Sequence, residues 1–163
     1  MIFHASIDAR QPRRVAEVLA EIFGGGSVAP FPPIADDSWL AMAGDDRNTM
    51  IEVYPRGVVL VEAAGDHDAI GQRDHLARSC AGSATHLAIA TRLQFADVVA
   101  IAVREGWPAK YRKRGGLFGV LEVWIEGDRM LEVLTAEMQA EYLAAMTPAN
   151  WTRLMASHPE AAS

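Results

Sequence analysis

The sequence repeats one pattern of residues, and this repeat constrains the fold more than any other feature. In each copy a histidine is followed 6 positions later by an arginine and 20 positions later by a glycine. Each copy closes on nearly the same tetrapeptide, one around Glu52 and one around Glu132. The histidines, His4 and His86, lie 48 and 46 residues before the glutamates of their own copies. The repeat predicts a duplicated supersecondary unit in which each copy contributes one imidazole and one carboxylate.

Hydrophobic periodicity predicts the same order of elements in both copies: a strand, a helix and then three strands. In the first copy, Pro12 suits the first turn of the helix, and the prolines from Pro30 to Pro33 limit the second strand to a sheet edge. The segments expected in the second copy are strand 85–91, helix 95–105, and strands 111–113, 118–126 and 129–135. A doubly wound parallel fold would instead alternate one strand with one helix.

The length of 163 residues favours one compact domain built from these two units. We expect a first module at 1–64, a connector at 65–83, a second module at 84–135 and a C-terminal helical extension at 136–163. A further strand is expected at 58–63. The extension is interpreted as a packing or dimer element, so we expect a homodimer.

Composition narrows the class of protein. The net charge of −6 argues against a nucleic-acid partner, which usually needs a basic face. The single cysteine, Cys80, excludes an intramolecular disulfide and makes a thiolate metal site unfavourable. Neither a membrane span of roughly 18 apolar residues nor a secretory signal is visible, so we expect no membrane partner and a cytoplasmic location.

The alternation of side chains along a strand places the four ionisable residues on one kind of face. The residues on either side of His4, Glu52, His86 and Glu132 suit packing against a helix. The ionisable side chains therefore point to the other face of the sheet. If that face is concave, the four groups converge, and mutual pairing or a divalent cation would offset the cost of their burial.

With these residues in place, the pattern resembles the vicinal oxygen chelate superfamily, the glyoxalase and bleomycin-resistance fold. Its members carry paired βαβββ modules, with a histidine on the first strand and a glutamate on the last strand of each. The segments 44–53 and 127–133 resemble the polar turn and acidic strand that end such modules. The resemblance covers 1–135 and implies an α+β fold in which two βαβββ modules form a cupped mixed β-sheet with helices on the outside.

The same resemblance implies a site and a reaction. His4, Glu52, His86 and Glu132 match the four-ligand set of glyoxalase I-like enzymes, and they suit one divalent ion of Zn, Ni, Mn or Fe. The function implied is a metal-dependent lyase or isomerase on a small molecule that chelates through vicinal oxygens. In that chemistry Glu132 or Glu52 is the general base.

Two other functions stay open at this point. His4, His86 and Glu132 also form a two-histidine, one-carboxylate triad, which suits the Fe²⁺ chemistry of a ring-cleaving dioxygenase-like oxygenase. Glu52 is then a bystander, so this residue discriminates between the two enzymes. Metal-free members of the superfamily are small-molecule binding or resistance proteins that keep the cleft without the ligands.

The segment 110–116 holds the main cluster of basic residues. Its Arg112 is predicted to clamp a substrate carboxylate or phosphate, because arginine offers a bidentate fork. A solvated edge strand, whose charges discourage aggregation, explains the same residues. Glu122 and Trp124 alternate with apolar neighbours and are predicted to line the same cleft.

Overall fold

The computed structural model describes residues 3–32, 35–61, 70–73 and 85–157. Cys80 and most of the predicted connector lie outside these ranges. Both predicted modules are present, and each runs strand, helix, then three strands. The α+β fold class expected from the sequence is confirmed.

The two modules have the same sheet topology. The first contains β1 (His4–Ala9), α1 (Pro12–Ile22), β2 (Ser27–Pro30), β3 (Trp39–Met42) and β4 (Met50–Pro55), with the sheet order β1-β4-β3-β2. The second contains β7 (Leu87–Ala90), α2 (Phe95–Glu105), β8 (Ala109–Arg114), β9 (Phe118–Ile125) and β10 (Arg129–Leu134), with the order β7-β10-β9-β8. In each sheet the first and last strands of the module pair in parallel, and the other pairs are antiparallel. Strand β2, which ends at Pro30, lies at a sheet edge.

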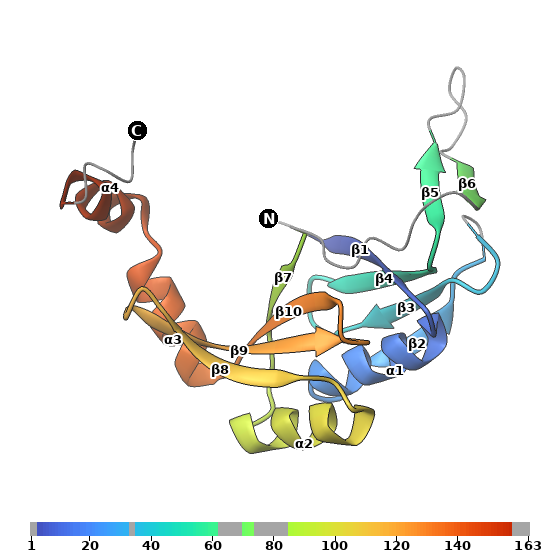
Figure 1. Ribbon diagram of the computed structural model, residues 1–163, viewed down its shortest axis with the longest axis horizontal. Helices are drawn as coiled ribbons and strands as arrows, with labels where there is room; N and C mark the ends of the chain where they lie inside the picture. Colours follow the sequence, from blue (N-terminus) through green and yellow to red (C-terminus); the bar gives the residue numbers. More distant parts are fainter. Residues whose placement is uncertain (1–2, 33–34, 62–69, 74–84, 158–163) are drawn as a thin grey trace.

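One hydrophobic core joins the modules. Val15 and Leu19 of α1 are buried against Ile51 and Val53 of β4, and the same cluster continues to Leu131 of β10. Helices α1 and α2 lie on the same side of the molecule, below the sheets in the view of Figure 1. The neighbours of Glu52 and Glu132 therefore face the core, as the alternation of residues predicts.

A polar junction also fixes the two modules relative to each other. Glu126, in the turn between β9 and β10, accepts hydrogen bonds from the backbone N–H groups of Arg10 (2.7 Å) and Gln11 (2.8 Å), just before α1. A carboxylate at this position also suits the positive end of the helix dipole. Beside it, Arg56 donates two hydrogen bonds to Asp128, of 2.7 and 2.9 Å, and lowers the pKa of that carboxyl.

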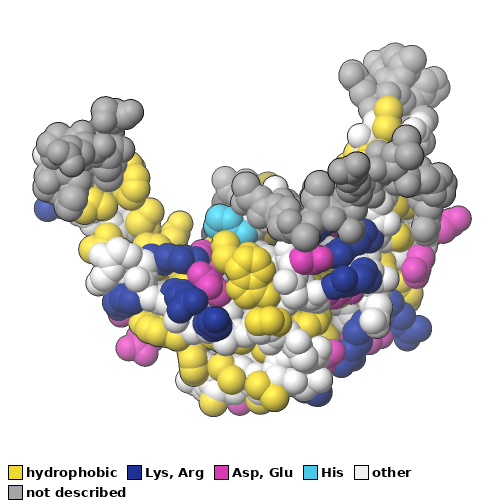
Figure 2. All heavy atoms as spheres, viewed as in Figure 1, with side chains coloured by type: hydrophobic (Ala, Val, Ile, Leu, Met, Phe, Trp, Pro, Cys, Tyr) yellow, Lys and Arg dark blue, Asp and Glu magenta, His cyan; other side chains and the backbone are white. Residues whose placement is uncertain are grey.

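Two additions extend the modules at opposite ends of the molecule (Figure 1). After β4, strands β5 (Val58–Val61) and β6 (Ile70–Arg73) form a separate antiparallel pair. Strand β5 was expected, whereas β6 was not, because its sequence shows no alternation. At the other end stand α3 (Ala136–Ala145) and α4 (Pro148–Ser157). The space-filling view shows the molecule hollowed between these two ends (Figure 2).

Helix α3 packs on the second sheet. Phe118 and Leu134 are buried with Met138 in a small cluster, and the Phe118 ring meets the Tyr142 ring edge-on at 5.0 Å between centroids. The second sheet is thus covered on parts of both faces. None of the helices within the described ranges is long and apolar enough to span a membrane.

Candidate metal and substrate site

In the first module, the carboxylate of Glu52 is held by hydroxyl groups. Ser6 Oγ and Tyr54 Oη each donate a hydrogen bond of 2.7 Å to Glu52 Oε2. Burial, together with this hydrogen bond, raises the pKa of Tyr54 to about 12, so the phenol keeps the proton that it donates. The other oxygen, Oε1, lies 3.9 Å from His4 Nε2. With a side chain only 13% exposed, Glu52 is oriented by neutral donors and keeps its capacity to bind a cation.

In the second module, the matching carboxylate already has a cation. Glu132 lies directly opposite Glu122 on neighbouring strands, and each residue is 8% exposed. Arg114 Nε donates to Glu132 Oε1 at 3.0 Å, and Nη2 donates both to that oxygen and to Glu122 Oε1 at 2.7 Å. The bond to Glu132 raises the pKa of Arg114 above its ordinary value. Two facing carboxylates repel each other, so this guanidinium stabilises their burial.

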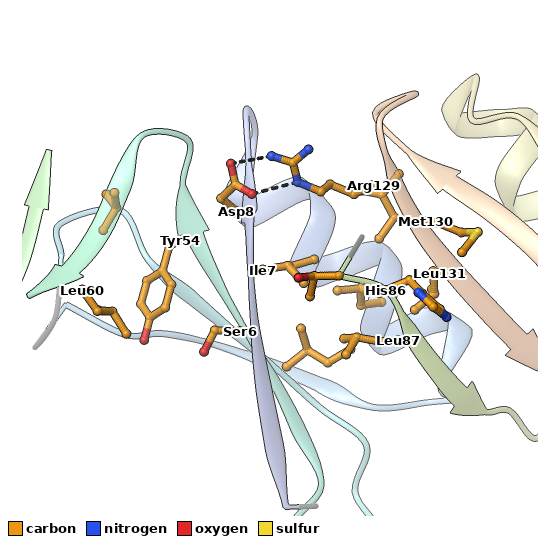
Figure 3. A pocket seen from close by; sticks show the side chains of 15 residues that line it. Ser6, Ile7, Asp8, Tyr54, Leu60, His86, Leu87, Arg129, Met130 and Leu131 are labelled. Carbon is orange, nitrogen blue, oxygen red and sulfur yellow. Dashed lines mark hydrogen bonds and ion pairs between the residues drawn. The ribbon is translucent and has the colours of Figure 1, made fainter. Parts of the chain in front are cut away.

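His86 lies where the two modules meet. It lines a cavity of about 290 Å³ together with Ser6 and Tyr54, whose hydroxyls hold Glu52. Figure 3 shows this cavity, with Arg129 of the second module bonded to Asp8 of the first at 2.9 and 3.1 Å. Ile7, Leu87 and Leu131 supply apolar wall to the same cavity (Figure 3).

A second cavity, of about 490 Å³, is lined by both His4 and His86. Asp45 also lines it, with its carboxylate accepting backbone hydrogen bonds from Arg47 (3.2 Å) and Thr49 (2.9 Å). A hydrogen bond from the Thr49 side chain, together with these backbone bonds, lowers the pKa of Asp45. The two histidines thus border one space, although they come from different modules.

The four predicted ligands do not come together as one group in this chain. His4 lies beside Glu52, whereas Glu132 is bound to Arg114. Across the described residues, no three His, Cys, Asp or Glu side chains lie close enough together to hold a metal ion. His86 shares the space next to His4 but is not part of such a group.

The three residues predicted to contact substrate lie apart from these two cavities. Arg112 is exposed on β8, with Nε 3.4 Å from Glu122 Oε2. Trp124 is half-buried and lies on the same face of β9 as Glu122, two residues along the strand. These residues border the paired carboxylates of the second module.

Sequence reasoning missed Ser6, Tyr54 and Arg114. Ser6 and Tyr54 lie two residues from His4 and Glu52 respectively, on the same strand faces, so the alternation rule contained the signal. Arg114 gave no such signal, because its contact with Glu132 depends on how far β8 extends beside β9.

Comparison with known proteins supports the fold. No family model matches this sequence, and no curated protein matches it either. Among solved structures, the fosfomycin resistance protein FosX from Mesorhizobium loti superposes with a TM-score of 0.51 at 13% identity, covering 86% of this chain and 95% of FosX. The chain has the fold of the vicinal oxygen chelate superfamily.

Two other similar solved structures are a glyoxalase I and a lactoylglutathione lyase. The trypanothione-dependent glyoxalase I of Leishmania major has a TM-score of 0.47 at 18% identity, covering 93% of this chain and 98% of its own. The lactoylglutathione lyase of Agrobacterium tumefaciens has a TM-score of 0.47 at 14% identity, with 84% and 94% covered. These two likenesses carry no argument about the reaction, which rests on the residues of the site.

Proposed function

We propose that this protein is a divalent-metal-dependent lyase or isomerase acting on a small molecule that chelates the metal through vicinal oxygens. The environment of Glu52 carries the proposal. Its largely buried carboxylate is fixed by Ser6 and Tyr54 and faces His4, with no Lys or Arg ion pair among the described residues. Hydrogen bonds of this kind orient carboxylate ligands in metal sites and tune them.

The four predicted ligands differ in how well they are placed to bind a metal ion. An imidazole and a carboxylate suit Zn²⁺, Ni²⁺, Mn²⁺ or Fe²⁺, so His4 and Glu52 would hold the ion. His86 borders the same cavity as His4 and would become a third ligand only by moving toward them. Glu132 joins this set only when Arg114 releases it. Arg114 would then keep Glu122 as its partner, so its own charge stays compensated.

Each residue has a part in the proposed reaction. A bound ion would supply Lewis-acid polarisation of a substrate oxygen. Glu52 is the favoured proton acceptor, because Glu132 is already engaged by Arg114. Tyr54 and Ser6 hold Glu52 in one orientation.

The test is elemental analysis of protein purified without added metal, followed by calorimetric titration with Ni²⁺, Zn²⁺, Mn²⁺ and Fe²⁺. We expect one ion per site, lost in His86→Ala, with circular dichroism confirming that the variant is folded. A wild-type protein that arrives without metal and refuses all four ions contradicts the proposal.

A second candidate is a metal-free small-molecule binding protein of the same fold. The ion pair of Arg114 with Glu132 favours it, since the chain itself neutralises one of the four predicted ligands. A thermal-shift screen in the presence of EDTA tests this function: ligands that raise the melting temperature without metal support it. Ligands that act only when metal is present support the enzyme.

The oxygenase triad of His4, His86 and Glu132 is less well supported, because it uses the carboxylate that Arg114 holds. Oxygen consumption with Fe²⁺ that stays unchanged in Glu52→Gln would favour it. Loss of oxygen consumption in Glu52→Gln would show that Glu52 is required, which argues against a triad without it.

A further inference from the structure

The cavity of about 290 Å³ that Ser6 and Tyr54 border is apolar over most of its depth, and its inner end reaches the core. Leu19 of α1, Ile51 of β4 and Leu131 of β10 line it, and each is at most 2% exposed. A ligand in this cavity can therefore bury a hydrocarbon group against side chains of both modules.

The size and the charge of the cavity restrict what it can hold. Small-molecule sites in proteins have volumes of about 300 to 1,000 Å³, so this cavity lies at the lower end of that range. Asp8 and Arg129 bring a carboxylate and a guanidinium to its wall, and these two groups bind each other at 2.9 and 3.1 Å (Figure 3). Because their charges compensate each other, a small uncharged molecule fits better than a large or charged one.

The polar end of the cavity accepts hydrogen bonds. Ser6 and Tyr54 each donate their hydroxyl hydrogen to Glu52 Oε2 at 2.7 Å. A hydroxyl group has one hydrogen and two lone pairs, so toward a ligand these two oxygens offer lone pairs only. A ligand carboxylate would meet acceptor oxygens and the negative charge of Glu52, with no donor to offset its burial. A ligand hydroxyl group would instead donate to them.

We propose that the ligand of this cavity is an uncharged aliphatic α-hydroxyketone, with its hydroxyl group at Ser6 and Tyr54 and its alkyl chain in the apolar end. Figure 3 shows the two ends: the oxygens of Ser6 and Tyr54 lie on one side of β1, and Ile7, Leu87 and Leu131 gather on the other side. The two oxygens of an α-hydroxyketone lie on adjacent carbons, so as a substrate class it rests on the proposed function.

The first test varies the length of the alkyl chain. The wild-type protein in EDTA is titrated with 1-hydroxypropan-2-one, 1-hydroxybutan-2-one and 1-hydroxypentan-2-one, and binding is followed by NMR of the Ile, Leu and Val methyl groups. We expect Kd to fall about fourfold for each added CH₂ group, because each is transferred from water to an apolar site. A Kd that does not change along the series overturns the proposal.

The second test varies the polar end and keeps the propyl chain. Pentan-2-one replaces the hydroxymethyl group of 1-hydroxypentan-2-one with a methyl group and should bind about fivefold more weakly, the effect of one hydrogen bond. In 2-oxopentanoate a carboxylate takes the same place, and its binding in EDTA should be weaker by at least about tenfold. Equal binding of 2-oxopentanoate and 1-hydroxypentan-2-one overturns the assignment of the polar end.

A pair of variants on β7 tests the location. Leu87 and Ile89 lie two residues apart on the same face and are both half-buried, but Leu87 lines this cavity and Ile89 borders only the larger one. Leu87→Ala should weaken binding of 1-hydroxypentan-2-one by at least about threefold through lost contacts, whereas Ile89→Ala should leave it unchanged. Equal weakening by both places the ligand elsewhere. The two ligand series need no variant, so they decide the proposal even if Leu87→Ala does not fold.

Repeating the titrations with Ni²⁺ in place of EDTA separates this inference from the proposed function. Nickel should tighten binding of 1-hydroxypentan-2-one and leave pentan-2-one, which has a single oxygen, unchanged. Dependence on chain length without an effect of Ni²⁺ removes the proposed function and keeps the ligand class. An effect of Ni²⁺ without dependence on chain length does the reverse.

Discussion

Glu52 and Glu132 occupy the same position in two copies of one module, yet their surroundings differ. Glu52 faces Ser6 across β1 and β4, and Tyr54 stands two residues further along. Glu132 faces Ala88 across β7 and β10, so the hydroxyl group found in the first module is missing there. Neutral hydroxyl donors orient the carboxylate of Glu52, whereas Glu132 has no such donor at the corresponding positions.

The strand on the other side completes the difference. Glu52 lies opposite Leu40 of β3, whereas Glu132 lies opposite Glu122 of β9. A leucine leaves Glu52 as a single carboxylate. A second carboxylate calls for a cation, which Arg114 supplies. A duplicated sequence therefore yields a duplicated fold without duplicated chemistry, because the cross-strand neighbours decide what each glutamate can bind.

The largest effect is expected from removing one carboxylate at a time. Glu52→Gln is expected to weaken divalent-metal binding by at least about 100-fold, and Glu132→Gln by about 10-fold or less, with ligand losses scaled from those known for supporting residues. The reason is that Glu132 binds a metal only by giving up Arg114. Calorimetric titration with Ni²⁺ measures both. Equal losses would show that the two modules contribute alike.

Removing the arginine that binds Glu132 is expected to change metal affinity in the opposite direction. Arg114→Gln is expected to tighten metal binding by about 10-fold, because the carboxylate no longer has a competing cation. Without metal, the same change lowers the free energy of unfolding by about 2 kcal/mol, since two buried carboxylates lose their shared partner.

Arg112→Gln is the matched control for this variant, because Arg112 pairs with Glu122, at 3.4 Å, from an exposed position. Its metal affinity should equal that of the wild type. Weaker metal binding in Arg114→Gln would mean that the arginine supports the site and does not compete for it.

A smaller effect is expected from the group that orients Glu52. Ser6→Ala removes one of its two hydrogen bonds and should weaken metal binding by roughly 10-fold, the lower range for such supporting contacts. The reciprocal change, Ala88→Ser, places a hydroxyl opposite Glu132 and should leave the affinity unchanged. An effect of Ala88→Ser as large as that of Ser6→Ala would remove the distinction between the modules.

The smallest effect concerns pH. Because the pKa of Tyr54 is raised from 10.0 to about 12, its contribution to stability is complete below pH 10 and is lost as the pH rises toward 12. Tyr54→Phe should therefore flatten the fall in unfolding free energy across this range. Ultraviolet titration of the phenolate checks the assignment: the latest-ionising tyrosine should disappear in the variant, and its persistence would assign the shift elsewhere.

Much of the fold could be predicted from local patterns of residues in the sequence. The alternation around Glu52 and Glu132 predicted which side of each strand faces the core, because a period of two is fixed by strand geometry. The helix at 95–105 was predicted with the bounds that the structure shows. The repeat fixed the order of elements, and the superfamily fold followed from it.

The surroundings of Glu132 could not be predicted in the same way. The contact of Arg114 with Glu132 depends on the register that places Arg114 opposite Phe118 and on the reach of a long side chain. The burial of Leu134 by α3 depends on where a helix outside the repeat comes to rest. Such tertiary neighbours leave no periodic signal in the chain.

The most direct test of the account is elemental analysis of the wild-type protein and of the His4→Ala and His86→Ala variants, each purified without added metal. The account predicts one bound ion in the wild type and none in either variant, with circular dichroism showing that both variants are folded. A wild type without metal, or wild-type metal content in either variant, would contradict a metal site built from His4, Glu52 and His86.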